Sequence, residues 1–328
     1  MNGILNILKP AGMTSHDVVN AVRRILKIRK VGHTGTLDPM AAGVLPVCVG
    51  SATRITEYLD ADYKKYRCEM QLGIQTDTED IWGNVLSRMA VAIETTETHE
   101  QCDKNENVMK RISEAAVIEA ARRFVGDVMQ KPPDYSAVRI AGRRLYEYAR
   151  NGESVLVEPR RINVKALTVR NFRHAEARVM FDIESSKGSY IRTICSEIGN
   201  ALGCGAAMSF LVRTACGRFE LEHATSLEEL ERATMDGRLQ DVMLPMDYPL
   251  TRFEAIQVIN ESRAQYFING GPLDPFETIG NLPVDGSLFR LYSGGVFIAM
   301  ARFDADTGKI KSDKVFHRGL NIKTEVRG

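Results

Sequence analysis

The sequence predicts an α+β protein with a large first domain and a small C-terminal β-barrel-like domain. Two observations lead to this fold class. Strand-like runs of alternating apolar residues occur among amphipathic helical segments throughout residues 1–249. From residue 250 to residue 328 the chain changes to short strands separated by frequent Gly- and Pro-containing turns, which favours a small β-barrel. We therefore expect one domain over 1–249 and a second over 250–328.

The first half of the large domain has three recognisable elements. Residues 3–8 have the composition of a short strand, and Ser15 is expected to cap a helix that runs to about residue 27. The segment 64–74 alternates as a strand does. The residues expected on its buried face are Tyr66, Cys68, Met70 and Leu72.

The rest of the large domain continues as helices and strands. In chain order we expect an amphipathic helix at 114–125, a proline-containing loop at 130–137, a short basic helix at 142–152, two strands within 162–184, a helix at 191–202, and a helix at 225–234 with a Ser226–Glu229 capping box. Residues 88–113 are polar and acidic and lack a clear period. We interpret them as a surface insertion.

The composition excludes several classes of protein. The chain has 328 residues, of which 44% are hydrophobic and 26% charged, as in ordinary globular proteins. Neither a signal peptide nor a long apolar span is recognisable, so a cytoplasmic location without membrane contact is expected. The six cysteines form no CxxC pair, which favours reduced structural thiols over a metal site. Nucleotide-binding glycine motifs are also missing, so we expect no cofactor.

The charge distribution is more informative than the net charge of +1. Residues 1–54 carry seven basic side chains against two acidic ones, and residues 131–161 carry seven against four. Residues 77–119 carry ten acidic side chains against four basic ones. Two basic stretches offset by an acidic one could form a one-sided positive face for nucleic acid, although charged runs are more often plain solvated surface.

The motif GHTGTLDP at 32–39 allows two interpretations of Asp38. An Asp followed by Pro39 is a common way to begin a helix, with Asp as the N-cap and Pro in the first turn. Alternatively, the glycines on either side of the histidine–threonine pair permit a tight turn that presents a fixed carboxylate. His33 is either a core histidine or a donor to phosphate.

Two further motifs carry aromatic and basic side chains. In KGSYIRT at 187–193, Arg192 is either a surface residue or a fixed cation that keeps a buried carboxylate ionised. In YKKYR at 63–67, Tyr66 is either a core residue, a surface on which a base stacks, or a phenol with a role in proton transfer. The residues alone do not decide between these alternatives.

Taken together, these motifs resemble those of the bacterial TruB-type tRNA pseudouridine synthases, which modify uridine 55 in the TΨC loop. The resemblance covers nearly the whole chain, through GILNILKPAGMTSHDVV, GHTGTLDPMAAGVLPVCVGSATR, YKKYRCEMQLGIQTDTED, PPDYSAVRIAGRRLYEYARNG and SSKGSYIRTICSEIGNALGCGA. It implies a catalytic domain built on a mixed, mainly antiparallel sheet with flanking helices, a thumb-like RNA-binding loop at about 125–155, and a C-terminal PUA-like RNA-binding domain.

The resemblance also implies a set of site residues. Asp38 corresponds to the catalytic aspartate, acting as nucleophile or base, Tyr66 to the base-stacking tyrosine, and Arg192 to the counter-ion. The substrate-binding residues implied are His33, Tyr190 and Leu211. From their charge and position, Lys9, Arg139, Arg143 and Arg144 are expected to contact phosphates. Arg139 replaces the usual lysine of the family, and Val212 replaces a common arginine.

The implied function is the isomerisation of uridine to pseudouridine by base flipping, without metal or other cofactor. The expected partner is the TΨC stem-loop of tRNA, with no obligate protein partner and a monomer as the default state. Two alternatives remain open. One is a non-catalytic RNA-binding or tRNA-folding chaperone, and the other is a pseudouridine synthase that acts on another RNA site.

Overall fold

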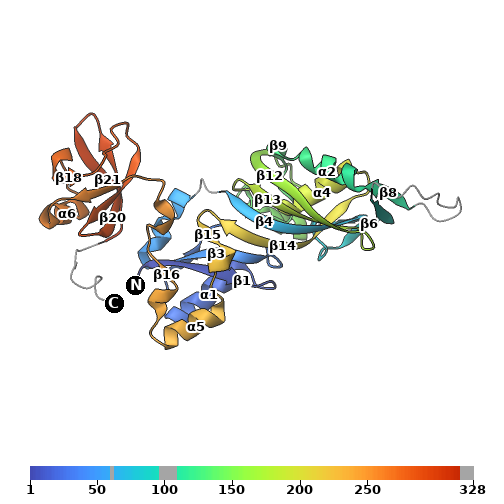
Figure 1. Ribbon diagram of the computed structural model, residues 1–328, viewed down its shortest axis with the longest axis horizontal. Coiled ribbons are helices and arrows are strands. Elements are labelled where there is room, and N and C mark those ends of the chain that lie inside the picture. Colours follow the sequence, from blue (N-terminus) through green and yellow to red (C-terminus); the bar gives the residue numbers. More distant parts are fainter. Residues whose placement is uncertain (60–62, 96–108, 318–328) are drawn as a thin grey trace.

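The computed structural model describes residues 1–59, 63–95 and 109–317, and its largest feature is a ten-stranded sheet (Figure 1). Strand β14 pairs in parallel with β3, and the sheet's other pairs are antiparallel, so the expected mixed, mainly antiparallel sheet is confirmed. The strands in spatial order are β16 (Met243–Leu244), β1 (Gly3–Lys9), β3 (Ala42–Val49), β14 (Ala206–Cys216), β4 (Lys64–Leu72), β13 (Arg178–Ser185), β12 (Arg160–Arg173) and β9 (Gly126–Gln130), while β2 (Val31–His33) pairs with β3 and β15 (Phe219–Glu220) with β14.

Strand β4 illustrates how the apolar pattern builds this sheet. The side chains of Tyr66, Cys68, Met70 and Leu72 alternate along it and are all buried in one core, as the sequence predicted. Because β4 pairs with β13 on one side and β14 on the other, it is a central strand of the sheet. Tyr66 is thereby held in a rigid frame rather than on a loop.

The parallel pair β3–β14 is short and unusually close. Gly43 of β3 has a φ of +108° and stands opposite Arg213 of β14. A Cβ atom at Gly43 would clash with the backbone of Arg213. Only glycine therefore fits this position, which brings the chain after Asp38 directly against β14.

Helices cover the two ends of the sheet (Figure 1). Helix α1 (Ser15–Leu26) packs with α5 (Leu227–Met235) beside β1, while α2 (Glu114–Arg122) and α4 (Ile191–Ala201) pack near β12, β14 and β4. The capping box of α5 at Ser226 and Glu229 is confirmed. Ser15, however, is not the cap of α1. The N-cap is Thr14, which exchanges hydrogen bonds with Asp17, and Ser15 faces inward.

The segment expected to be a surface insertion contributes to the core at both of its ends. After the hairpin of β5 (Ile74–Thr76) and β6 (Val85–Arg88), strands β7 (Val91–Glu94) and β8 (Lys110–Ser113) pair in parallel. They bury Ile93 and Ile112 in the main core, a single apolar side chain each, which is too weak a pattern to read from sequence. Residues 96–108, including Cys102, lie outside the described residues. The other five cysteines are free and buried.

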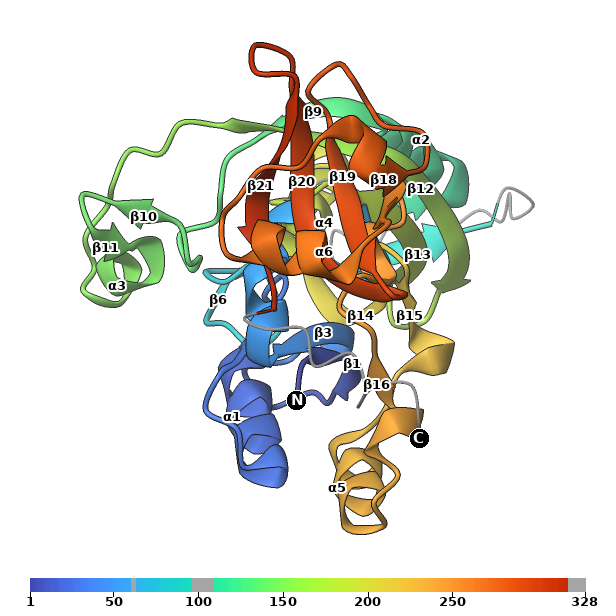
Figure 2. The same ribbon diagram turned by 90° about the vertical axis from the view of Figure 1, so that its left-hand side faces the viewer.

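The thumb-like segment leaves the sheet after β9. It contains a small hairpin of β10 (Arg139–Ile140) and β11 (Arg143–Arg144), followed by helix α3 (Leu145–Arg150). Figure 2 shows these elements standing apart from the sheet. The helix is shorter than the expected 142–152, because the two arginines before it pair in the hairpin.

The C-terminal part forms a second sheet with its own core. Its strands, in the order β18 (Thr278–Ile279), β17 (Ala255–Val258), β19 (Leu288–Ser293), β20 (Val296–Asp304) and β21 (Lys309–Val315), accompany helix α6 (Glu261–Ile268). Phe297 and Phe316 lie in one apolar cluster with Ile55 and Tyr58, which belong to the 3-10 helical segment that follows β3. The 3-10 helices are η1 (Gly50–Arg54), η2 (Thr56–Leu59), η3 (Leu221–His223), η4 (Leu239–Asp241), η5 (Tyr248–Leu250) and η6 (Pro275–Glu277). Among the helices of the described residues, none has both the length and the apolar character that a membrane span requires.

Candidate active site

Asp38 lies in a turn between β2 and β3, not at the start of a helix. The Ala41 N–H donates to the Asp38 carbonyl at 3.1 Å, and β3 begins at the next residue, Ala42. The interpretation of Asp38 as a helix N-cap, one of the two left open by the sequence, is wrong, because strand β3 begins immediately after one turn. The Asp38 carboxylate is 38% exposed. The turn therefore leaves this carboxylate accessible from solvent.

The side chain of Lys9 binds the backbone of this turn. Its side chain is fully buried, and Nζ donates to the carbonyl oxygens of Pro10, Pro39 and Ala41 at 2.8, 3.0 and 2.6 Å. An ammonium group has three N–H donors, and all three are used here. The expectation that Lys9 contacts a phosphate was therefore wrong. Burial lowers the pKa of Lys9 to about 8, so the ammonium form still predominates at neutral pH.

Ser15 fixes the other side of the turn. Its hydroxyl accepts a hydrogen bond from the Leu37 N–H at 2.9 Å and donates to the Leu37 carbonyl at 3.1 Å. Both residues are buried. The backbone of Asp38 is thus held by one anchor immediately before it and one immediately after it, which fixes the point from which its side chain extends.

Arg192 supplies the positive charge next to this carboxylate, from the first turn of α4. Its Nε lies 3.7 Å from Asp38 Oδ2, and its side chain is only 6% exposed. Its Nη2 donates to the Tyr135 carbonyl at 2.5 Å and its Nη1 to the Thr78 carbonyl at 3.5 Å. Since 3.7 Å is too long for a hydrogen bond, the pair is a charge contact that leaves the Asp38 oxygens available.

A second buried guanidinium belongs to Arg213, on the strand next to that of Tyr66. Arg213 of β14 is registered opposite Tyr66, donates from Nε to the Val44 carbonyl at 2.7 Å, and from Nη2 to the Gly35 carbonyl at 3.0 Å. Its Nη1 is buried without a partner in the described residues. Burial raises the pKa of the Tyr66 hydroxyl, and the charge of Arg213 opposes that rise. The phenol therefore stays protonated at neutral pH.

The remaining predicted residues, Tyr190, Leu211 and His33, differ in where the structure places them. The Tyr190 ring is 5.8 Å from the Arg192 guanidinium carbon, so the two side chains stack as a cation–π pair. Leu211 is buried in the same core as Tyr66. His33 is half-buried with Nδ1 lacking a partner in the described part of the chain, and burial lowers its pKa. Of the predicted residues, the structure therefore brings Asp38, Arg192 and Tyr190 together, and it shows no direct contact of His33 or Leu211 with this group among the described residues.

The three predicted thumb arginines are all exposed but not equivalent. Arg143 forms an ion pair with Glu153 at 3.1 Å and stacks over the Tyr148 ring at 4.2 Å. Arg144 lies 5.7 Å from the ring of Tyr146. Arg139 has no side-chain partner among the residues that the structure describes. Arg139 is accordingly the most available of the three for an anion.

The sequence also matches known families and structures. Residues 23–191 match the profile of the TruB family pseudouridylate synthase (N terminal domain). The chain belongs to the TruB family. It is accordingly an isomerase. Residues 192–251 match the tRNA pseudouridylate synthase B C-terminal domain.

Relatives of this TruB family member align over most of its length. The tRNA pseudouridine synthase B of Alkaliphilus oremlandii is 44% identical and that of Clostridioides difficile 39%, over 82% and 96% of this chain and 82% and 100% of those proteins. Among solved structures, a Cbf5–Nop10–Gar1 complex contains a chain that is 25% identical with a TM-score of 0.67, covering 96% of this chain and 85% of that one. The α+β pseudouridine-synthase fold is therefore shown.

Sequence reasoning missed three charged features of this candidate site: the anchoring role of Lys9, the buried Arg213, and Asp80. Asp80 is half-buried near Arg192; burial raises its pKa, and the charge of Arg192 opposes the rise. Arg213 carried a usable signal, because it is the one charged residue in the strand AAMSFLVRTAC. A charge inside an apolar strand must be paired or hydrogen-bonded, which marks a functional candidate.

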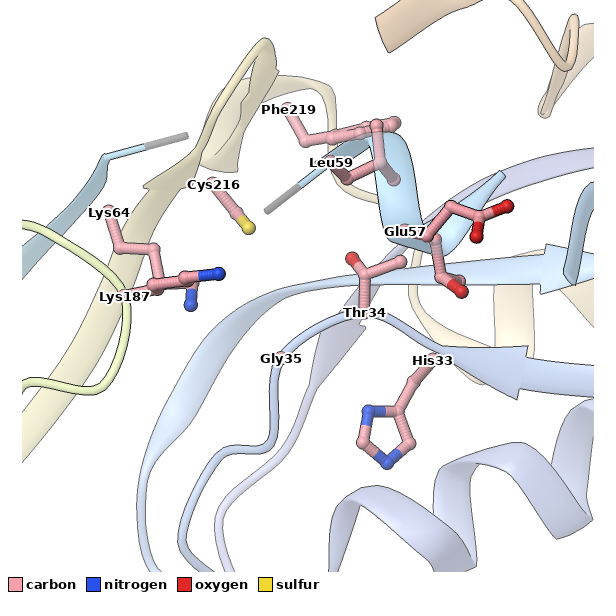
Figure 3. Close-up of a pocket in the computed structure, with 10 residues that line it drawn as sticks. His33, Thr34, Gly35, Glu57, Leu59, Lys64, Lys187, Cys216 and Phe219 are labelled. Atoms are coloured by element: carbon pink, nitrogen blue, oxygen red, sulfur yellow. The ribbon is translucent and has the colours of Figure 1, made fainter. Parts of the chain in front are cut away.

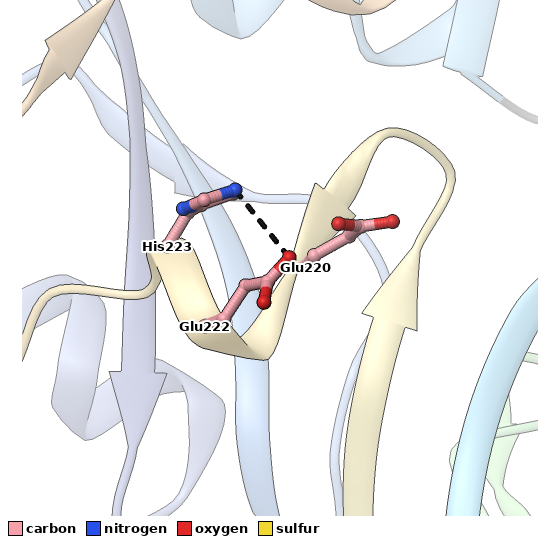
Figure 4. A group of neighbouring side chains, drawn as sticks. All are labelled: Glu220, Glu222 and His223. Carbon is pink, nitrogen blue, oxygen red and sulfur yellow. Dashed lines mark ion pairs between the residues drawn. The ribbon is translucent and has the colours of Figure 1, made fainter.

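Two other features of this TruB protein lie outside the Asp38–Arg192 pair. A cavity of about 330 Å³ is lined by His33, Lys64 and Lys187, among others, but not by Asp38 (Figure 3). Glu220, Glu222 and His223 form an exposed cluster whose ligand atoms lie within 4.8 Å of one another (Figure 4). Exposed clusters of this kind are common without an ion, and we assign no metal to it.

Proposed function

We propose that this chain converts uridine 55 in the TΨC loop of tRNA to pseudouridine, acting alone, as a monomer, with Asp38 as the catalytic carboxylate. The observation that carries the proposal is the partly exposed Asp38 carboxylate, 3.7 Å from the buried Arg192 and anchored on both sides. The relatives named tRNA pseudouridine synthase B support the choice of tRNA.

The chemistry requires a carboxylate with a free oxygen. Isomerisation breaks the bond between C1′ and N1 of uridine and forms a bond between C1′ and C5, with no net oxidation. Asp38 either attacks as a nucleophile or removes a proton from the sugar. In both routes Arg192 stabilises the charge without occupying an oxygen. Its attraction is worth about 4 kcal/mol at an effective dielectric of about 20, and less after solvent screening.

The target uridine must leave the RNA stack to reach Asp38. Base flipping costs a few kcal/mol, and stacking on an aromatic ring returns about 1–3 kcal/mol. Tyr66 supplies that ring in our proposal. It is only 8% exposed, so a base meets it only after entering the site. Tyr190 and His33 complete the walls of the base pocket, with Leu211 as an apolar contact.

The RNA itself contacts a wider surface. We assign phosphate contacts to Arg139 and Arg144 of the thumb-like segment, which stands apart from the sheet (Figure 2). We also infer a catalytic domain at 1–249 and a PUA-like RNA-binding domain at 250–328. The support for the second domain is its separate sheet and core.

The test uses the purified chain and an unmodified tRNA transcript, with pseudouridine mapped by position. We expect product at position 55 with the wild-type protein. Asp38→Asn should bind the tRNA within about twofold of wild type while its turnover falls at least about 10³-fold. No product from the wild-type protein would favour a binding-only role, and product elsewhere would favour another RNA target. Turnover by Asp38→Asn would refute the assignment of Asp38.

A further inference from the structure

The base of the thumb-like segment is joined to the start of α4 by one side chain. Gln130, the last residue of β9, is 2% exposed. Its Oε1 accepts from the Tyr190 N–H at 2.8 Å, and its Nε2 donates to the Tyr190 carbonyl at 3.1 Å. Both polar groups of this buried amide are therefore used on the backbone of a single residue.

That residue is the point at which α4 begins. Tyr190 is the N-cap, with an extended backbone (φ −103°, ψ 106°) and no side-chain cap of its own. The first N–H groups of a helix have no intrahelical partner and are satisfied by other groups. The Gln130 side chain supplies one acceptor and one donor to the Tyr190 backbone, as the backbone of a neighbouring strand would. It fixes the backbone from which the side chains of Tyr190 and, two residues later, Arg192 emerge.

A second contact joins the same two segments. Arg192 Nη2 donates to the Tyr135 carbonyl, five residues after Gln130, at 2.5 Å. Pro132 and Pro133 lie between these two contact points, and both are buried. Proline fixes φ near −65°, so this connection is stiff. Movement of the thumb base would consequently be transmitted to the Arg192 guanidinium.

The geometry points to Gln130 as a positioning residue for the reaction: its two hydrogen bonds set Tyr190 and Arg192 relative to Asp38 and couple them to the base of the thumb-like segment. Gln130 does not touch the reacting atoms; it acts through the α4 backbone. This inference rests on the proposed function of Asp38 and Arg192.

The test compares Gln130→Glu with Gln130→Ala. An ionised glutamate accepts from the Tyr190 N–H but opposes its carbonyl oxygen with a second acceptor. A protonated glutamate has the shape of glutamine and restores both hydrogen bonds, and burial favours the protonated form. Alanine offers neither bond at any pH. The two variants thus differ in pH dependence, which a general loss of structure would not produce.

The readout is the single-turnover rate of pseudouridine formation divided by the wild-type rate at each pH from 6 to 8. This ratio cancels any pH dependence that the three proteins share, including that of Asp80 and of Glu79, whose carboxylate accepts from the Thr193 hydroxyl next to Arg192. The cationic Arg160, registered opposite Gln130 on β12, is also the same in all three. For Gln130→Glu we expect the ratio to rise at least about tenfold from pH 8 to pH 6. For Gln130→Ala it should stay low and flat, with tRNA affinity within about threefold of wild type.

Three results would overturn the inference. They are wild-type rates in both variants, equal losses at every pH, and a loss explained wholly by weaker tRNA binding. Asp38→Asn in the same assay separates the two proposals. If Asp38→Asn is inactive and the Gln130 variants behave as wild type, only the inference on Gln130 fails. If Asp38→Asn turns over, the proposed function fails, and this inference with it.

Discussion

Thr14 and Ser15 offer a matched pair of hydroxyl deletions beside the turn that carries Asp38. Thr14→Ala removes the exposed N-cap of α1. Ser15→Ala removes both hydrogen bonds to the buried backbone of Leu37, next to Asp38. The two changes are adjacent in sequence and similar in size. They separate the stability of the helix from the hold on the turn.

The two magnitudes follow from burial. Loss of an N-cap costs about 1 kcal/mol of the free energy of unfolding. Ser15→Ala leaves a buried N–H and a buried carbonyl of Leu37 unpaired, at about 1–3 kcal/mol for each such group, so we expect a loss of about 2–6 kcal/mol of the free energy of unfolding. A misplacement of the Asp38 carboxylate by about 1 Å would lower the rate about 10²-fold.

The assay measures single-turnover pseudouridine formation with enzyme in excess, beside urea unfolding of each variant. We expect Thr14→Ala to keep the wild-type rate and Ser15→Ala to lose about 10²-fold at a temperature where both remain folded. Equal rates in the two variants would show that the Ser15–Leu37 contacts do not position Asp38. A Ser15→Ala variant with a lower free energy of unfolding but the wild-type rate would refute the same reasoning.

Two further predictions concern cations. Burial lowers the pKa of Lys9 from 10.5 to about 8, so between these pH values the unfolded chain holds a proton that the folded protein has released. The free energy of unfolding of the wild type should therefore rise with pH over this range relative to that of Lys9→Met. Urea unfolding at each pH measures the difference. Over the same range the wild-type rate should fall, because a neutral amine has only two N–H donors for three carbonyls. Arg139→Ala should reduce the slope of log affinity for tRNA against log salt concentration by about 1, because one phosphate contact is lost. Arg143→Ala should reduce this slope less, because the Arg143 side chain is paired with Glu153. Equal slopes in the two variants would count against this ranking.

The sequence predicted correctly those elements for which the local residue pattern favours the same structure as the packing in the fold. Strand β4 follows its alternating apolar residues, and α5 follows its capping box at Ser226 and Glu229. The pairing of Asp38 with Arg192 was implied by family resemblance, because neither residue carries a decisive local signal. Its geometry required the structure.

The turn at Asp38 shows why local preference fails where distant residues meet. Asp–Pro favours a helix start, but Lys9, about thirty residues earlier, binds the carbonyls that a helix would use. Lysine is usually solvated, so burial of Lys9 among three carbonyls had no sequence signal. Arg213 had one, as a lone charge in an apolar strand, and it was not recognised.

The placement of β14 has a consequence for the chain during its synthesis. This strand joins two halves of the sheet, one around β1 and β3 and the other from β4 to β9. Until residue 216 is made, β4 has an unpaired edge, for roughly 10–30 s at bacterial-like elongation rates of about 5–20 residues per second. Such an edge invites wrong pairing. Until β14 is inserted, the nascent chain also lacks the Arg213 hydrogen bonds to the carbonyls of Gly35 and Val44, which lie on either side of Asp38 in the sequence.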